Sequence, residues 1–361
     1  MVGGKQPKRA SAVEESAFWL LQNLFLKFFM QSCQFNTEKN ARTYTVESVT
    51  SGHPDKVCDQ ISDAILDACL SQDPKSRVAV ESFGAHGLLV IGGEITSDAI
   101  VNASEIARTV YRDIGYNEDL EIIERIVQQS PDIALGVDQD GAGDQGIMYG
   151  YATDETPEYL PRGVVLVHQL THGLENLRRN GKLSWLRPDG KAQVTMEDGR
   201  ARTVLVSTQH GEEVAQGEIR DALIEELIRP IIGDVSKVEI LVNPTGRFVQ
   251  GGFEADTGLT GRKLMVDTYG GIWPHGGGAF SGKDATKVDR SAAYMARYAA
   301  KNLVANGFAK EALVSVSYAI GKAEPLMVSG VDENGNDLSN LVRGRFDFRP
   351  KAIIQKLGLR R

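Results

Sequence analysis

Hydrophobic residues beyond the first forty positions recur at helical and strand spacings. Apolar residues at every fourth position predict a helix over 57–70, because this spacing places them on one face. RVAVESF (77–83) and LLVIGGEI (88–95) are separated by GAHG and are predicted to form a hairpin. A second helix is predicted over 98–114. This first stretch therefore indicates a hairpin flanked by two helices.

The same order of elements recurs along the chain. The second stretch predicts a helix over 164–179, strands over 192–196 and 203–209, and a helix over 217–228. The third predicts a helix over 291–304 and strands over 313–321 and 325–330. Three such stretches indicate an internal structural repeat, although the residues themselves are only weakly similar.

The short hairpin connections favour an α+β fold, with sheets covered by helices on one side, over a parallel doubly wound sheet. The boundaries are expected near the Gly/Asp-rich stretch at 136–146 and near Gly251. We therefore expect domains over 41–138, 139–251 and 252–361.

Three acidic residues follow a helical spacing on the first predicted helix. Asp59, Asp63 and Asp67 lie four residues apart, on a face other than the apolar one. We expect that face to be solvated, as charged helix faces usually are.

The first forty residues differ from the rest. A basic start precedes the apolar run AFWLLQNLFLKFFM (17–30), which is too short to span a bilayer and carries Lys27. A secretory signal peptide, an amphipathic helix on a membrane or partner surface, and an appended leader with Met30 as a later start remain open. We expect residues 1–40 to be a disordered or appended leader that is dispensable for fold and catalysis.

The amino-acid composition excludes some classes of protein and disfavours others. With 42% hydrophobic and 24% charged residues among 361, the chain is not disordered throughout. Its 40 basic and 48 acidic residues leave a formal net charge of -8, which counts against a nucleic-acid partner. Cys33, Cys58 and Cys69 form neither a disulfide framework nor a Cys-based metal site and fit a reducing compartment. We expect a cytoplasmic protein without stable membrane insertion.

The motif SGHPDK (51–56) places an imidazole, a carboxylate and an ammonium just before the first helix. Carboxylates such as Asp55 bind Mg²⁺ together with phosphates, and His53 could donate to a phosphate or a leaving oxygen. The alternative is that Asp55 only caps the helix and His53 is a turn residue.

The motif HGGGAFSGKD (275–284) contains the G-x-x-x-x-G-K front of a phosphate-binding loop. Asp284 replaces the usual Ser or Thr, and no clear apolar strand precedes the motif, so the standard fold of such loops is not expected. Glycine amides with Lys283 still predict a polyphosphate cradle, and Lys287 and Asp289 follow closely. The alternative is a surface loop with solvated lysines.

Three further segments add candidate ligand groups. NPTGRF (243–248) and GLTGRK (258–263) contribute Arg247, Arg262 and Lys263, and Phe248 either stacks on an adenine or belongs to the core. GAGDQG (141–146) allows close backbone approach to a ligand, or forms only a tight turn.

WLRPDGK (185–191) offers Asp189 for a ribose or base and Lys191 for a phosphate. The alternative for this segment is an ordinary Pro-Asp-Gly turn.

Together these motifs resemble those of the S-adenosylmethionine synthetase (methionine adenosyltransferase) family. GHPDK, GAGDQG, NPTGRFVQGG–DTGLTGRK and GGGAFSGKD stand in the family's order, and the resemblance runs from about Thr45 to Leu357. It implies three similar α+β domains with pseudo-threefold symmetry. It also implies that the methionine sulfur attacks the ribose C5′ of ATP and displaces tripolyphosphate, which is then hydrolysed to phosphate and pyrophosphate.

The resemblance also implies roles for individual residues. The catalytic residues are His53, Lys191, Arg262 and Lys283. The ATP-binding residues are His53, Asp189, Lys191, Arg247, Phe248, Asp256, Arg262, Lys263, Ala279 and Lys283. The methionine-binding residues are Glu94, Gln129, Asp256 and Lys287, and Asp144 lies near adenosine and methionine. The metal ligands are Asp55 and Asp289 for Mg²⁺, with two ions per site, and Glu81 for K⁺.

The family's active sites lie between subunits, so a homo-oligomer, a dimer of dimers, is expected to bind ATP and L-methionine. The leader, the short gate segment at about 129–139 and the stop at Arg361 without an aromatic-rich tail depart from the family pattern. An ATP-dependent phosphotransferase is a rival and would release ADP. A non-catalytic binding subunit is a second rival, but every catalytic-type position carries a competent residue.

Overall fold

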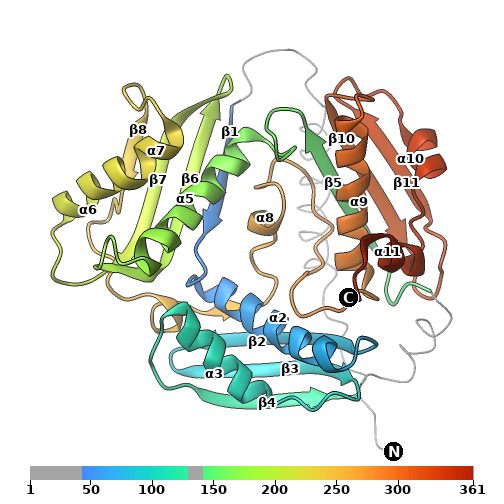
Figure 1. Ribbon diagram of the computed structural model, residues 1–361, viewed down its shortest axis with the longest axis horizontal. Coiled ribbons are helices and arrows are strands. Elements are labelled where there is room, and N and C mark those ends of the chain that lie inside the picture. The colour runs from blue at the N-terminus through green and yellow to red at the C-terminus, as the bar shows by residue number, and fades with distance from the viewer. Residues whose placement is uncertain (1–42, 129–140, 361) are drawn as a thin grey trace, which may run out of the picture. The chain divides into compact units, whose positions relative to one another are not determined.

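The computed structural model describes residues 43–128 and 141–360, and it contains all three predicted helix–hairpin stretches (Figure 1). The leader and the gate segment, which includes Gln129, lie outside the described residues. Among the described residues, no helix is long and apolar enough to cross a membrane.

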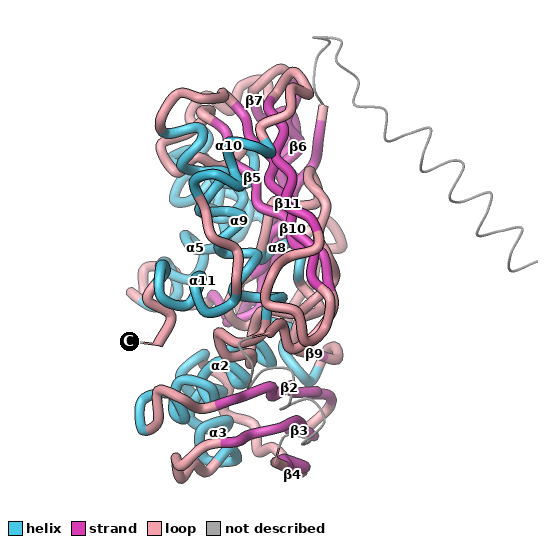
Figure 2. The backbone as a smooth tube through the Cα atoms, turned by 90° about the vertical axis from the view of Figure 1, so that its right-hand side faces the viewer, coloured by secondary structure: helices cyan, strands magenta, loops and turns pink. Residues whose placement is uncertain are grey.

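The first unit follows the predicted order. Its elements are α2 (Pro54–Gln72), β2 (Arg77–Ala85), β3 (Leu88–Thr96), α3 (Ala103–Ile114) and β4 (Glu121–Val127). Helix α3 begins five residues later than predicted, because the Asn102 side chain caps it by accepting the Glu105 N–H at 3.1 Å. In Figure 2, α2 and α3 lie on one side of β2, β3 and β4.

The second unit corrects two predictions. Its elements are α5 (Arg162–Arg179), β6 (Leu186–Glu197), β7 (Arg200–His210), α6 (Gln216–Leu223), the π-helix η1 (Ile224–Ile228), α7 (Arg229–Ile232) and β8 (Glu239–Val242). Strand β6 includes Asp189, so the Pro-Asp-Gly turn is wrong there; a shift of register between Leu186 and Gly190 accommodates the proline and glycine. The helix predicted over 217–228 changes from an α-helix to a π-helix at Ile224. This change comes just before Pro230, which cannot donate a helical hydrogen bond.

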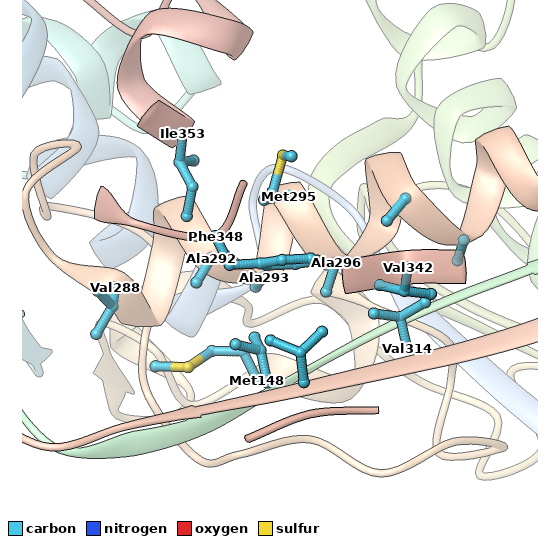
Figure 3. Close-up of a cluster of buried hydrophobic side chains, with 14 of the residues drawn as sticks. Met148, Val288, Ala292, Ala293, Met295, Ala296, Val314, Val342, Phe348 and Ile353 are labelled. Atoms are coloured by element: carbon cyan, nitrogen blue, oxygen red, sulfur yellow. The ribbon is translucent and has the colours of Figure 1, made fainter. Parts of the chain in front are cut away.

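The third unit contains the small-residue helix. Its elements are α9 (Val288–Ala305), β10 (Glu311–Tyr318), β11 (Met327–Asp332), α10 (Ser339–Arg345) and α11 (Pro350–Leu357). Alanines of α9 pack on Met148 and Val314, as Figure 3 shows. A Cβ added to Gly150 would lie 2.0 Å from the Ala296 carbonyl carbon, so this close packing needs glycine on the strand.

Each sheet includes a strand from another part of the chain. In each hairpin the first strand, β2, β6 or β10, pairs antiparallel with such a strand. These added strands are β9 (Gly258–Leu259) on β2, β1 (Tyr44–Val49) on β6 and β5 (Gly146–Thr153) on β10. Strands β1, β5 and β9 thus join sheets across the predicted domain boundaries, which stay a prediction.

The face of the first sheet away from α2 carries an apolar row. Leu259, Phe83, Val90 and Ile123 stand in register across β9, β2, β3 and β4. Phe83 is 39% exposed and Leu259 and Ile123 are each 37% exposed. Large apolar side chains in a contiguous exposed row indicate an interaction surface.

Candidate active site

His53 caps α2 and is buried. Its Nδ1 accepts the backbone N–H of Asp55 at 3.2 Å, and the residue is only 2% exposed. Burial, followed by the charges of Lys263 and Lys191, lowers the pKa of His53 to about 3. The imidazole is therefore neutral near pH 7, and because Nδ1 accepts a hydrogen bond, Nε2 carries the proton. His53, rather than Asp55, is the cap of this helix.

Asp55 lies between two cations from the GLTGRK loop. Its Oδ1 is 2.7 Å from Arg262 Nε and its Oδ2 is 2.6 Å from Lys263 Nζ. Oδ1 also accepts the Leu259 N–H at 3.0 Å. Burial alone would raise the pKa of Asp55, but the hydrogen bonds from Lys263 and Leu259 outweigh it and lower that pKa. Asp55 thus holds the two cations at the start of α2.

The acidic face of α2 is not uniformly solvated, which corrects the expectation above. Asp59 is 3% exposed; its Oδ1 accepts the Gly261 N–H at 2.8 Å and its Oδ2 accepts from Lys56 at 3.1 Å. Lys56 also donates to Asp267 of α8 (Leu264–Asp267). Burial raises the pKa of Asp59 more than Lys56 and the Gly261 amide lower it.

Asp63 and Asp67 differ from each other. Asp63 accepts the Gly282 N–H at 3.0 Å and pairs with Arg290 at 2.8 Å. Asp67 is exposed, so the expectation of a solvated carboxylate is confirmed there. Sequence reasoning therefore missed Asp59, Asp63 and Arg290, and the only signal for the two carboxylates was their four-residue spacing.

Lys283 of HGGGAFSGKD and Lys287 just after it are paired and largely buried, so the alternative of solvated lysines is wrong. Lys283 is 2.7 Å from Asp289 and Lys287 is 2.7 Å from Asp284, with side chains 18% and 17% exposed. Asp284 also accepts the Val78 N–H at 2.8 Å, which joins this loop to β2. Helix α9 begins only at Val288, consistent with the expected departure from a standard phosphate-binding loop.

Two glycine motifs meet at Asp289. A Cβ added to Gly278 would lie 2.2 Å from Asp289 Oδ1, and one added to Gly146 of GAGDQG would lie 3.6 Å away. A Cβ on Gly261 would lie 2.3 Å from Ala279 Cβ, so the GLTGRK and HGGGAFSGKD loops touch each other. The two cation-bearing loops and GAGDQG therefore belong to one site.

Asp189 offers an unused acceptor. It is 4% exposed, and its Oδ2 accepts the Gly252 N–H at 3.0 Å. Its Oδ1 is buried without a hydrogen-bond partner in the part of the chain that the structure describes. Burial raises the pKa of Asp189 to about 6. Such an oxygen is suited to accept a hydrogen bond from a ligand hydroxyl or N–H group.

Lys191 and three other predicted residues lie nearer the surface. Lys191 is exposed on β6, within electrostatic reach of His53, and forms no ion pair within 43–128 and 141–360. Arg247 pairs at 2.8 Å with exposed Glu212. Asp144 and Asp256 are exposed, and each accepts the N–H of the next residue at 2.7 Å.

Phe248 is half-buried beside His210, whose Nε2 accepts the Phe248 N–H at 3.1 Å. It is absent from the buried core clusters of the described residues. Its aromatic ring is thus placed at an edge rather than inside a core.

Glu81 and Glu94 lie on the first sheet, on the face that carries the apolar row. Glu81 alternates with buried neighbours on β2 and is exposed, and Glu94 of β3 is partly exposed. Ala79 stands in register with Glu94 on one side and forms a bridge to Lys283 on the other. Glu94 is thus one strand away from the Lys283 loop, whereas Gln129 lies outside the described residues.

The carboxylates of the site, Asp55 and Asp289, are suited to bind Mg²⁺ only together with a phosphate ligand. No group of three or more His, Cys, Asp or Glu side chains that could hold a metal occurs among the described residues. Magnesium is usually bound by one or two carboxylates with phosphate and water oxygens, which fits Asp55 and Asp289. Cys58 and Cys69 are buried free thiols and contribute nothing to the site.

Known proteins resemble this chain over most of its length. Family models for the N-terminal, central and C-terminal domains of S-adenosylmethionine synthetase match residues 41–131, 139–248 and 250–361. The S-adenosylmethionine synthase of Pseudothermotoga lettingae is 52% identical over 89% of this chain and 90% of its own. That of Petrotoga mobilis is 49% identical over 88% of this chain and 89% of its own.

The low pKa of His53 predicts a specific acid sensitivity. The unfolded chain binds a proton at about pH 6.5 and the folded one only near pH 3, so stability falls as the pH falls through this window. Between pH 6.5 and 5 the loss is about 2 kcal/mol, from ~1.4 kcal/mol per pH unit. His53→Asn, which keeps a capping acceptor, is expected to remove that loss from unfolding measurements at pH 7 and 5. The exposed His172→Asn control should retain it, and an unchanged acid loss in His53→Asn would contradict the assignment.

Proposed function

The chain belongs to the S-adenosylmethionine synthetase family, and we propose that it forms S-adenosylmethionine from ATP and L-methionine at the site around His53. The observation that carries this proposal is the pairing of Asp55 with Arg262 and Lys263 beside a neutral, buried His53. Lys283 and Asp289 extend the same site, because their loop touches the GLTGRK loop.

The chemistry needs charge stabilisation rather than a strong base. The thioether sulfur of methionine is a neutral nucleophile, and the leaving group is the whole triphosphate. The barrier is then set by the alignment of sulfur with C5′ and by the negative charge that develops on the departing oxygen. Arg262, Lys263, Lys283 and Lys191 supply fixed positive charge, which explains a site without a Ser-His-Asp arrangement.

His53 is suited to the leaving oxygen. The Asp55 N–H occupies Nδ1, and no described residue accepts from Nε2–H, which can therefore donate toward the C5′ oxygen as the bond to carbon breaks. Because His53 is a neutral donor, the lysines and arginines supply the positive charge of the site. As negative charge grows on the C5′ oxygen, the hydrogen bond from His53 to that oxygen becomes stronger. His53 thus acts on the transition state more than on bound ATP.

The remaining residues divide between the substrates. We assign ATP contacts to Asp189, Arg247, Phe248, Asp256 and Ala279. Asp189 Oδ1, which has no hydrogen-bond partner among the described residues, would accept from a ribose hydroxyl or the base. We assign methionine contacts to Glu94, Gln129, Asp256 and Lys287, and place Asp144 near both substrates. Tripolyphosphate, once released, remains among the same cations for hydrolysis to phosphate and pyrophosphate.

Asp55 and Asp289 would hold Mg²⁺ jointly with the triphosphate, two ions per site, and Glu81 would hold K⁺. Bound Mg²⁺ supplies positive charge that offsets the triphosphate. On binding the metal, Asp55 would lose part of its ion pair with Lys263, and Asp289 part of its ion pair with Lys283.

A second subunit is expected to cover the face of the first sheet that carries the apolar row. Glu81 and Glu94 share this face with the apolar row Leu259–Phe83–Val90–Ile123. If the two acidic residues serve the active site, a partner on this face would place the site between subunits. This supports the homo-oligomer, a dimer of dimers, implied by the family; the cytoplasmic location stays a prediction as well.

Sedimentation of the full chain tests the subunit interface. We expect the mass of a dimer or larger, and a shift toward monomer in Phe83→Asp, because a buried charge opposes association. Ile100→Asp is the matched control, since Ile100 is 90% exposed outside the sheet. A wild-type monomer at micromolar concentration would contradict the interface.

The products test the reaction itself. Purified full chain with ATP, L-methionine, Mg²⁺ and K⁺ is expected to yield S-adenosylmethionine, phosphate and pyrophosphate. EDTA should abolish turnover, and replacing K⁺ by tetramethylammonium should lower it. ADP as the nucleotide product would instead support a phosphotransferase, and full turnover in EDTA would refute the role of Mg²⁺.

A further inference from the structure

We propose that Asp59 and Asp63 are positioning residues, each holding the backbone of one loop whose cations act on the triphosphate. Asp59 holds the loop with Arg262 and Lys263, and Asp63 holds the loop with Lys283. The inference rests on the proposed function, because it takes these cations as the groups that stabilise the leaving triphosphate.

Asp59 fixes the loop immediately before its cations. The Gly261 N–H donates to Asp59 Oδ1 at 2.8 Å, and Arg262 is the next residue. Gly261 has φ +74°, a conformation that residues with side chains rarely adopt, so the turn relies on glycine and on this hydrogen bond. Lys56 holds the second carboxylate oxygen at 3.1 Å, which fixes the Asp59 side chain itself.

Asp63 fixes the second loop at two points. Its Oδ1 accepts the Gly282 N–H at 3.0 Å, directly before Lys283. Arg290 bonds Asp63 at 2.8 Å and donates from the same nitrogen to the Lys283 carbonyl at 3.1 Å. Asp63 therefore holds the amide before Lys283 directly and the carbonyl of Lys283 through Arg290.

Both loops also meet the same edge of β2. Strand β9 pairs with Phe83 and Gly84, and the Val80 N–H donates to the Gly282 carbonyl at 3.0 Å. Lys283 itself bridges Ala79, so β2 and α2 hold this loop together. A misplacement of about 1 Å can cost about 10²-fold in rate, so anchors of this kind affect chemistry without contacting substrate.

Steady-state kinetics of single variants test the proposal first. Asp59→Ala and Asp63→Ala are each expected to lower kcat about 10- to 100-fold, with smaller changes in the KM for methionine. Asp59→Asn and Asp63→Asn keep an oxygen acceptor and should recover part of the loss. Asp67→Ala, on the same helix and exposed, is the matched control and should leave kcat unchanged.

Double variants separate positioning from a general loss of stability. Lys283→Ala alone is expected to lower kcat about 10²–10³-fold. In the Lys283→Ala background, Asp63→Ala should lower kcat little further, whereas in the Arg262→Ala background it should keep its full effect. Asp59→Ala should keep its full effect in the Lys283→Ala background and lower kcat little further in the Arg262→Ala background. Losses that multiply fully in both backgrounds, or unchanged kcat in the Ala variants, would overturn the proposal.

Binding of inorganic tripolyphosphate with Mg²⁺ gives a readout that does not need turnover. Calorimetric titration should show at least 10-fold weaker binding to Asp63→Ala and Asp59→Ala than to Asp67→Ala. Equal affinities would overturn the positioning role. A wild-type chain that binds tripolyphosphate but forms no S-adenosylmethionine would refute the proposed function alone.

Discussion

The site depends on one face of α2, where three carboxylates accept backbone N–H groups from two distant loops. Asp55 binds the Leu259 amide, Asp59 the Gly261 amide and Asp63 the Gly282 amide. Because 3.6 residues complete a helical turn, residues four apart lie along one side of the helix. A regular ladder of acceptors on a rigid helix thus orders two loops that contain little regular structure of their own.

Asp55 and two carboxylates outside α2 limit the repulsion between the gathered cations. Lys263 pairs with Asp55, Lys283 with Asp289 and Lys287 with Asp284. Unpaired charges would be costly to bury, whereas these pairs keep the site stable before substrate arrives. A triphosphate with Mg²⁺ can replace the carboxylates as partners of the cations. His53 stays neutral because it is buried and because the charges of Lys263 and Lys191 oppose its protonation.

The features that could be predicted from the sequence are those that local residue patterns determine. Helical and alternating apolar spacings located the helices and hairpins, and the motif residues gathered in one site where loop glycines permit close approach. The sequence did not predict strands β1, β5 and β9 in other sheets, because long-range pairing leaves no local pattern. Asp189 was ambiguous because Pro-Asp-Gly is typical of turns, and Asp59 looked solvated because its partner, Gly261, is 202 positions away.

Hydrogen–deuterium exchange measures most directly whether α2 holds these loops. In the ligand-free chain, the account predicts that the amides of Gly261 and Gly282 exchange far more slowly than those of an unstructured peptide. Asp59→Asn should accelerate exchange in segment 258–263 and leave 280–284 unchanged, with Asp67→Asn altering neither. Exchange of both glycine amides at the unstructured rate in the wild-type chain would contradict the claim.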